Sequence, residues 1–335
     1  MSWERRANCC NNTPVLPILL VTFPFFALVL CGYVAARGRM LPLEAIPGLN
    51  GFVLYFALPC MLYRFGATTP IAQLLDARVF FTWLLCALIM VGFTLAVSLN
   101  QRIGWNDGAF GALVAAFPNT GFMGVPLLVA LLGAQAAGPI IVTIVVDMVI
   151  TTSLCIALSR LESAEEHGMA VALRNALKGV LRNPMPWAIL LGGVASAMGL
   201  ELPAPVNKTV GLLADAASPV ALFTIGAVLA RSQMLAALHQ HAPIPLGDYL
   251  PVAGFKLLLH PVLVLLLGGG AIRLGFGPDR FALTVMALIA ALPSASNVSL
   301  LAERFGADNG RIARIILVST AAAFFTFSGA VALLT

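Results

Sequence analysis

Three ionisable side chains stand in the middle of long apolar stretches of this 335-residue sequence. Asp147 lies within the stretch 138–160, and Lys256 lies within 248–272, with His260 one helical turn further on the same face. Charges at bilayer depth are costly and usually functional. Asp147 and Lys256 could pair across a protein core, and protonation that opens such a pair would couple protons to transport. A static salt bridge that braces the core is the alternative.

Two other apolar stretches are interrupted by proline. The stretch 108–132 contains Pro118 and Pro126, and the stretch 281–304 contains Pro293. Proline removes an amide donor and clashes with the preceding helical turn, so both stretches are predicted to be broken helices. Broken helices in a membrane leave free amides at their half-helix N-termini, which attract anions.

Small and polar residues adjoin these prolines and form the candidate substrate site. They are Asn119, Thr120, Gly121, Ser294, Ser296 and Asn297. Neutral donors beside free helix amides suit a carboxylate ligand. The alternative is that these polar groups only repair the hydrogen bonds that the prolines remove.

The composition indicates a protein that spans a membrane several times. Apolar residues make up 60% of the chain, charged residues make up only 10%, and the mean hydropathy is +0.97. The net charge of +5 does not indicate nucleic-acid binding, because Lys and Arg lie at the ends of apolar runs. The six cysteines show no metal-ligand or disulfide spacing, so we expect no metal and no cofactor.

A spanning helix needs roughly 20 apolar residues, and ten segments meet this requirement. The sequence thus predicts an all-α membrane protein. We expect the first segment to be a membrane helix rather than a cleaved signal sequence. The ten predicted spans are 15–36, 46–67, 78–100, 108–132, 138–160, 184–200, 208–231, 248–272, 281–304 and 309–334.

The distribution of basic residues predicts the orientation. Eleven of the 19 Lys and Arg residues fall to the odd-numbered loops, and seven fall to the termini and even-numbered loops. Basic residues favour the cytoplasmic side. We therefore expect both termini to lie outside and the linker 161–183 to lie in the cytoplasm.

The two halves of the chain resemble each other weakly. Pro59 through Gly66 recurs as Pro219 through Gly226, a shift of 160 residues that preserves proline, leucine, glycine and an aromatic. Residues 1–160 and 184–335 would then be two five-helix repeats. Because five is an odd number, the second repeat must be inverted, which is typical of transporters.

The segment Phe117 through Leu128, which reads FPNTGFMGVPLL, resembles a motif of the auxin efflux carrier family, as do Leu49 through Pro59 and Arg182-Asn183-Pro184. This family contains plant PIN-formed auxin exporters and bacterial carriers assigned to malonate or malate. The resemblance implies ten helices in two inverted repeats, with spans 4 and 9 crossing at their breaks. It also implies a scaffold of spans 1, 2, 6 and 7, a mobile unit of spans 3–5 and 8–10, and an elevator movement.

The resemblance further implies that Asn119 faces the substrate carboxylate. Homodimers are common in the family, while the sequence leaves the oligomeric state of this chain open. Met148 and Ser153 stand where the plant pattern has glutamine and tyrosine, and Asp147 replaces an apolar residue. The chain therefore looks like a bacterial inner-membrane member that carries a small organic acid rather than indole acetate.

Four function classes compete at this point. The first is a secondary carrier of an organic anion, driven by protons, and the second is a related carrier driven by sodium. The third is an anion channel, because broken helices also build selectivity filters. An intramembrane enzyme is disfavoured, because the spans hold no set of metal ligands and no Ser/His pair.

Overall fold

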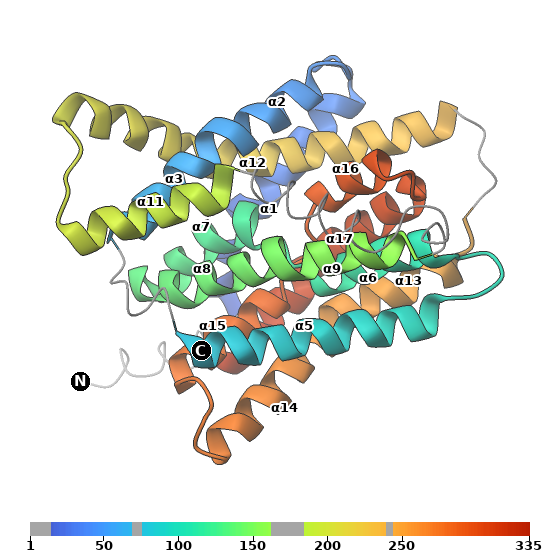
Figure 1. Cartoon of the computed structure of the whole chain (residues 1–335). Helices are drawn as coiled ribbons and strands as arrows, with labels where there is room; N and C mark the ends of the chain where they lie inside the picture. Colours follow the sequence, from blue (N-terminus) through green and yellow to red (C-terminus); the bar gives the residue numbers. More distant parts are fainter. Residues whose placement is uncertain (1–14, 69–75, 162–183, 239–243) are drawn as a thin grey trace, which may run out of the picture.

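The computed structural model describes residues 15–68, 76–161, 184–238 and 244–335, and their regular structure is helical (Figure 1). The predicted linker 161–183 lies, except for Leu161, outside the described residues. The helices are α1 (Val15–Arg37), α2 (Ile46–Phe52), α3 (Leu58–Thr68), α5 (Ala77–Ser98), α6 (Trp105–Ala116), α7 (Val125–Leu132), α8 (Ala137–Val145), α9 (Thr152–Ser159), α11 (Pro184–Met198), α12 (Ala204–Leu238), α13 (Leu246–Gly254), α14 (His260–Arg273), α15 (Arg280–Ala290), α16 (Asn297–Arg304) and α17 (Asn309–Leu334).

Short turns of other helix types join several of these helices. A 3₁₀ turn, η3 (Ala134–Ala136), precedes α8. Four π-helical turns occur in the described residues, at η1 (Val53–Ala57), η2 (Thr120–Gly124), η4 (Val146–Thr151) and η5 (Phe255–Leu259). π-Helical turns are uncommon and often mark functional sites.

Six continuous helical segments of the described chain are long and apolar enough to cross a membrane: Ile46–Thr68, Ala77–Ser98, Ala134–Ser159, Ala204–Leu235, Leu246–Arg273 and Asn309–Leu334. Four apolar helices are shorter: Phe23–Arg37, Thr120–Leu132, Trp187–Met198 and Arg280–Ala290. The last of these ends before Pro293, and Thr120–Leu132 begins after Pro118, so proline accounts for part of the shortening. The chain is an integral membrane protein, and its predicted number of ten spans stays a prediction.

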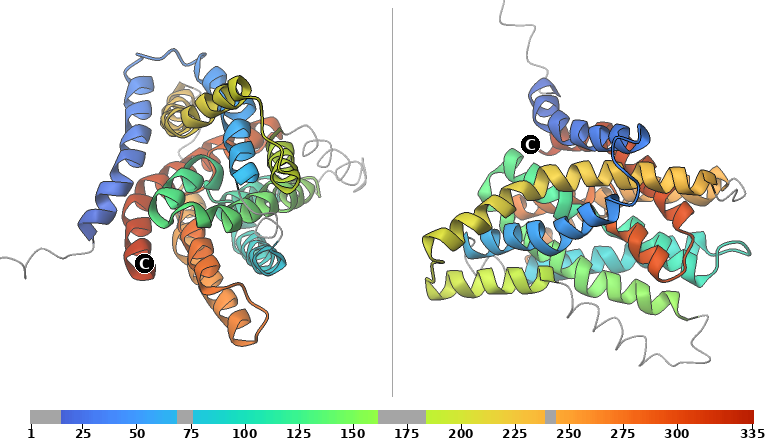
Figure 2. Two further views of the ribbon diagram at one scale, coloured as in Figure 1. Left: turned by 90° about the vertical axis from the view of Figure 1, so that its left-hand side faces the viewer. Right: turned by 90° about the horizontal axis from the view of Figure 1, so that it is seen from above.

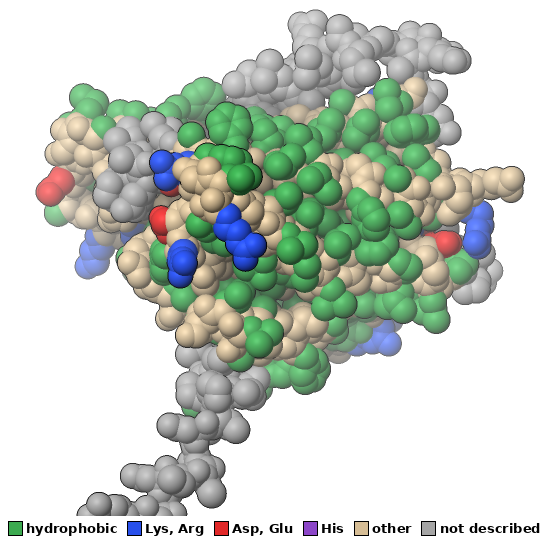
Figure 3. Space-filling view, turned by 90° about the horizontal axis from the view of Figure 1, so that it is seen from below, with side chains coloured by type: hydrophobic (Ala, Val, Ile, Leu, Met, Phe, Trp, Pro, Cys, Tyr) green, Lys and Arg blue, Asp and Glu red, His purple; other side chains and the backbone are tan. Residues whose placement is uncertain are grey.

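Helix α5 presents an apolar face to the outside of the protein. Phe81, Leu85, Ile89, Phe93 and Val97 recur every four residues and are exposed. This spacing places them on one helix face, which suits contact with lipid tails. In the view of Figure 3, most charged side chains likewise lie toward the two ends of the molecule, and apolar side chains cover much of the surface between them.

Helices α1 and α12 approach each other until their backbones touch (Figure 2). A Cβ atom on Gly32 would lie 1.8 Å from the carbonyl oxygen of Phe223, and one on Gly226 would lie 1.8 Å from that of Val29. Both distances are far below van der Waals contact. Only glycine therefore fits at these two positions.

Helices α3 and α11 form a second pair of the same design. A Cβ atom on Gly66 would lie 2.8 Å from the carbonyl oxygen of Ile189, and one on Gly192 would lie 2.3 Å from that of Tyr63. Every position in the first pair corresponds to a position in the second at a shift of 160 residues: Val29 to Ile189, Gly32 to Gly192, Tyr63 to Phe223 and Gly66 to Gly226. This is the register in which the sequence halves resemble each other.

Candidate functional site

Two breaks, one between α6 and η2 and the other between α15 and α16, are joined by backbone hydrogen bonds. The amide of Asn119 donates to the carbonyl of Pro293 at 2.8 Å, and the amide of Ala295 donates to the carbonyl of Phe117 at 3.0 Å. Pro118 and Ser294 face each other in this short antiparallel bridge. Extended backbone from the two halves of the chain thus makes hydrogen bonds that partly replace those lost from the helices at proline.

Two helix N-termini start at this bridge without a side-chain cap. Asn119 precedes η2 and Ser296 precedes α16, and neither side chain accepts a capping hydrogen bond. The first amides of a helix have no intrahelical partner, and the helix dipole makes this end electropositive. Pro126 lies in the first turn of α7, which continues η2. The geometry therefore offers uncapped helix ends on both sides of the bridge.

Polar side chains at the bridge are buried and incompletely bonded. The side chains of Asn119, Thr120 and Ser294 are at most 2% exposed, Ser296 is buried, and Asn297 is half-buried. Within the described part of the chain, the side-chain oxygens of Asn119, Ser294 and Asn297 have no hydrogen-bond partner. Unsatisfied buried polar atoms are rare in folded proteins, and a bound ligand or water is one way to satisfy them.

Asp147 is fully buried in η4, and one of its oxygens is bonded by neighbours. Trp83 Nε1 donates to Oδ1 of Asp147 at 3.0 Å, and Thr151 Oγ1 donates to the same atom at 3.3 Å. The other oxygen, Oδ2, has no partner among the described residues. The carboxyl group is thus oriented by α5 and by its own helix while keeping one free oxygen.

Lys256 is fully buried in η5 and reaches the end of α15. Its Nζ donates to the carbonyl of Ala290, the last residue of α15, at 2.6 Å and lies 3.2 Å from Nδ1 of His260. The ion pair with Asp147 that the sequence favours is not formed. Instead, the indole ring of Trp83 lies 5.2 Å from the imidazole ring of His260, so Trp83 and His260 link the two charged groups indirectly.

Three of the π-helical turns carry candidate site residues. Thr120 opens η2, Asp147 lies in η4 and Lys256 lies in η5. A π-helical turn contains an extra residue, which rotates the following side chains relative to an α-helix. These turns therefore help to set which way the polar groups of the three segments face.

Asp215 has a different partner from the one that the sequence suggests. Because Asp215 lies one turn before Pro219, the sequence predicts that its carboxylate bonds backbone amides freed near that proline. In the structure it accepts a hydrogen bond from Nη1 of Arg64 at 2.6 Å. The pair joins α3 to α12, and both side chains are exposed. Since Arg64 is a long side chain from another helix, no pattern local to α12 could have indicated this contact.

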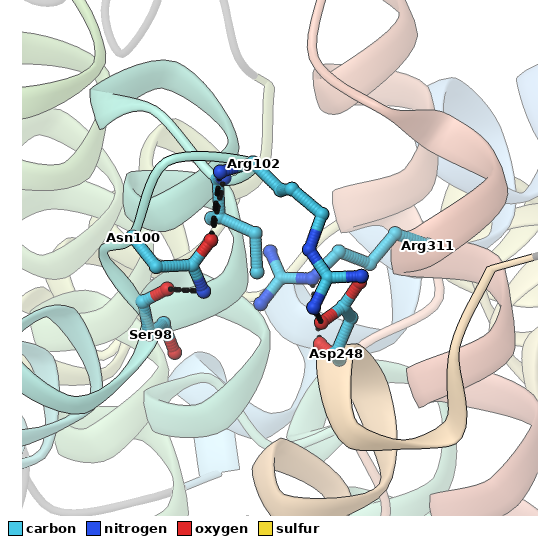
Figure 4. A network of polar contacts seen from close by, with 6 residues as sticks. Ser98, Asn100, Arg102, Asp248 and Arg311 are labelled. Atoms are coloured by element: carbon cyan, nitrogen blue, oxygen red, sulfur yellow. Dashed lines mark hydrogen bonds and ion pairs between the residues drawn. The ribbon is translucent and has the colours of Figure 1, made fainter.

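Arg311 of α17 ties its own helix to α6 and α13, and Figure 4 shows it beside Asp248. Its guanidinium donates to the carbonyl of Asp248 through Nε at 2.8 Å and to that of Asp107 through Nη1 at 2.9 Å. Arg102 approaches the Asp248 carboxylate at 3.8 Å. A Cβ atom on Gly111 would lie 2.8 Å from Arg311 Nη1, so this glycine makes room for the guanidinium. Arg311 is therefore buried, although the count of basic residues that predicts the orientation assigns it to a loop.

Three polar residues near the site were not identified from the sequence. Trp83 bonds Asp147, and Ser319 of α17 accepts a hydrogen bond from the amide of Ser294 at 3.2 Å. Thr224 has a buried hydroxyl without a partner in the described chain, on α12, which packs against η2. Neither a tryptophan near the start of a span, where this residue type is common, nor single Ser and Thr residues carry a signal that could have found them.

The chain is similar to known transport proteins over most of its length. A family model described as membrane transport protein matches residues 17–331. A putative malonate transporter of Rhizobium meliloti is 28% identical over 310 residues, which are 92% of this chain and 93% of that protein. The transporter YfdV of Escherichia coli K12 is 28% identical over 84% of this chain and 86% of its own, and auxin efflux carrier component 8 of Arabidopsis thaliana is 20% identical over 66% and 74%.

Proposed function

Since the chain belongs to the membrane transport protein family, also known as the auxin efflux carrier family, we propose that it is a secondary carrier of a small organic anion. The single observation that carries this proposal is the hydrogen-bonded bridge at Pro118 and Ser294, with uncapped helix N-termini and unpartnered buried polar atoms beside it. The substrate site comprises Asn119, Thr120, Gly121, Ser294, Ser296 and Asn297.

A small dicarboxylate is the proposed substrate class. The relative from Rhizobium meliloti is named a putative malonate transporter, and it aligns with nearly the whole chain. Two helix N-termini close together can each receive one carboxylate of such a molecule. Met148 is an apolar, unbranched residue where the plant pattern has glutamine, which argues against the plant auxin pocket.

Uptake into liposomes tests this function. Purified protein is reconstituted, and malonate, malate and a series of monocarboxylates are supplied as labelled substrates. A carrier gives saturable uptake that competing dicarboxylates inhibit, whereas a channel gives flux that rises linearly with substrate concentration. The absence of flux for every small carboxylate would contradict the proposal.

We further propose ten spans in two inverted repeats, with α1, α2–α3, α11 and α12 as a fixed scaffold. The glycine contacts support this arrangement, because α1 with α12 and α3 with α11 are packed through positions related by the same 160-residue shift. The remaining spans would move as a unit that carries the bridge. Arg311, which ties α6, α13 and α17 together, lies within that unit.

Asp147 is the proposed site of proton coupling. It is buried with one unpartnered oxygen, so a movement that changes its surroundings can change its protonation. We expect Asp147→Asn to leave malonate binding measurable but to abolish the pH dependence of uptake. Uptake is measured across a pH series with the membrane potential clamped. Glu201→Gln, at an exposed loop position, is the control and should keep the wild-type profile. An unchanged profile in Asp147→Asn would refute the coupling role.

The orientation is tested with single cysteines in a cysteine-free background. The basic-residue distribution predicts that the turn after α5 lies in the cytoplasm and that the turn after α11 lies outside. We expect Glu201→Cys to react with an impermeant thiol reagent in intact cells and Gln101→Cys to react only after permeabilisation. Both positions are exposed, so accessibility to the reagent does not differ for structural reasons. The opposite labelling pattern would reverse the proposed orientation.

A further inference from the structure

The buried ammonium of Lys256 lies at a place where ion-coupled carriers hold a cation. In carriers with broken helices, half-helix C-terminal ends and unwound carbonyls coordinate the coupling ion. Here the C-terminal end of α15 stops at Ala290, directly before the break, and its carbonyl accepts a hydrogen bond from Lys256 Nζ at 2.6 Å. The last carbonyls of a helix have no intrahelical donor and carry partial negative charge, which a cation stabilises.

Two acceptor atoms lie around Nζ, the carbonyl oxygen of Ala290 and Nδ1 of His260. An ammonium group has three donors and no acceptor, so Nδ1 of His260, at 3.2 Å, acts as the acceptor and the proton of the neutral ring resides on Nε2. The Lys256 side chain is 0% exposed, so these two contacts stand in for two of the water molecules that a free ammonium would bind. Asp147 is linked to the same cluster through Trp83, whose indole donates to Asp147 and lies 5.2 Å from the ring of His260.

We propose that Lys256 is a tethered cation that fills a cation site at the end of α15, so that the carrier binds its substrate without a metal ion. The ammonium neutralises the partial negative charge at the C-terminal end of α15. The partial positive charge of the helix N-termini beside the bridge then makes the site selective for an anion. A lysine that only braced the helices would bring the same contacts, but its removal would not create an affinity for cations. This difference makes the proposal testable.

The test measures the thermal unfolding of purified variants in chloride salts of choline, sodium and methylammonium at equal ionic strength. We expect the melting temperature of the wild type to be the same in all three salts. Lys256→Ala leaves the carbonyl of Ala290 without its donor and opens the space that the side chain filled. In choline chloride its melting temperature should therefore lie below that of the wild type. It should rise as methylammonium or sodium is increased, because a ligand that binds the folded state stabilises it.

Two variants serve as controls. Lys256→Arg keeps a cation at the position and should show no response to sodium or methylammonium. Lys208→Ala removes an exposed lysine from α12 and should behave like the wild type. If Lys256→Ala cannot be purified in choline, its yield of folded protein with and without methylammonium during purification becomes the readout.

Three results would overturn the proposal. They are a wild type that sodium stabilises, a wild type whose substrate uptake requires sodium, and a Lys256→Ala variant that no small cation stabilises or restores. The inference extends the proposed carrier function, but the thermal measurements need no substrate. A failure to find a transported carboxylate would therefore count against the proposed function and leave this test unaffected.

Discussion

Replacing Asn119 or Asn297 with alanine is expected to weaken malonate binding by about 10- to 150-fold. The estimate follows from the loss of one hydrogen bond to a charged group, which contributes roughly 1.5–3 kcal/mol. Each amide side chain stands next to an uncapped helix N-terminus, and its Nδ2 group is the donor from which a carboxylate can accept a hydrogen bond. Its removal therefore takes away a ligand contact without breaking a described side-chain bond. The affinity is measured by calorimetry on purified protein.

The control for these variants separates binding from folding. Thr320→Ala removes a buried hydroxyl of α17 whose hydrogen bond, 2.7 Å to the carbonyl of Ile316, lies within its own helix. We expect this variant to bind malonate normally. If Asn119→Ala and Asn297→Ala also bind normally while keeping wild-type melting temperatures, the two residues only support the breaks and the substrate lies elsewhere.

The largest loss of stability is expected for Gly226→Ala and Gly32→Ala. A Cβ atom at either position would lie 1.8 Å from a carbonyl oxygen of the facing helix, so the α1–α12 pair must separate by more than an ångström. Overpacking a tight contact usually costs about 1–3 kcal/mol, and here the obstacle is rigid backbone on both sides. We expect a large fall in the yield of monodisperse protein and in the melting temperature, both followed by fluorescence-detected chromatography after heating.

Gly211→Ala is the matched control, because it makes the same change in the same helix. A Cβ atom on Gly211 would meet nothing within 4 Å, and alanine favours a helix over glycine by about 1 kcal/mol. The control should therefore be at least as stable as the wild type. Equal behaviour of Gly226→Ala and Gly211→Ala would show that the two helices are not held in backbone contact.

Much of the helix pattern follows from sequence, and the reasons are physical. Long apolar runs have few alternatives to helices in a membrane, since every backbone polar group must be bonded within the chain. Pro118 and Pro293 mark the breaks, because proline has no amide donor for the backbone hydrogen bond that a helix requires. The family resemblance implied that the two breaks cross, but the hydrogen bonds between them could not be derived. They join residues more than 170 positions apart through backbone atoms, to which side-chain identity gives no guide.

The buried charges show a similar limit. Their depth in apolar stretches was enough to single out Asp147 and Lys256, and opposite charges in spans 5 and 8 suggested a direct pair. The two side chains form no salt bridge in the structure, because the indole of Trp83 bonds Asp147 and the carbonyl of Ala290 bonds Lys256. Which side chains meet between two helices depends on how each helix is rotated about its axis. The π-helical turns η4 and η5 change that rotation for the residues that follow them.

The bridge between the two breaks also bears on thermodynamics. Two amide–carbonyl bonds hold the segments at Pro118 and Ser294 together, so neither break can be displaced without the other. In the proposed carrier, a site assembled in this way would present the same groups at the same spacing whichever aqueous phase it faces. We then expect its intrinsic dissociation constant to be equal on the two sides of the membrane, so that substrate binds with the same affinity during import and export.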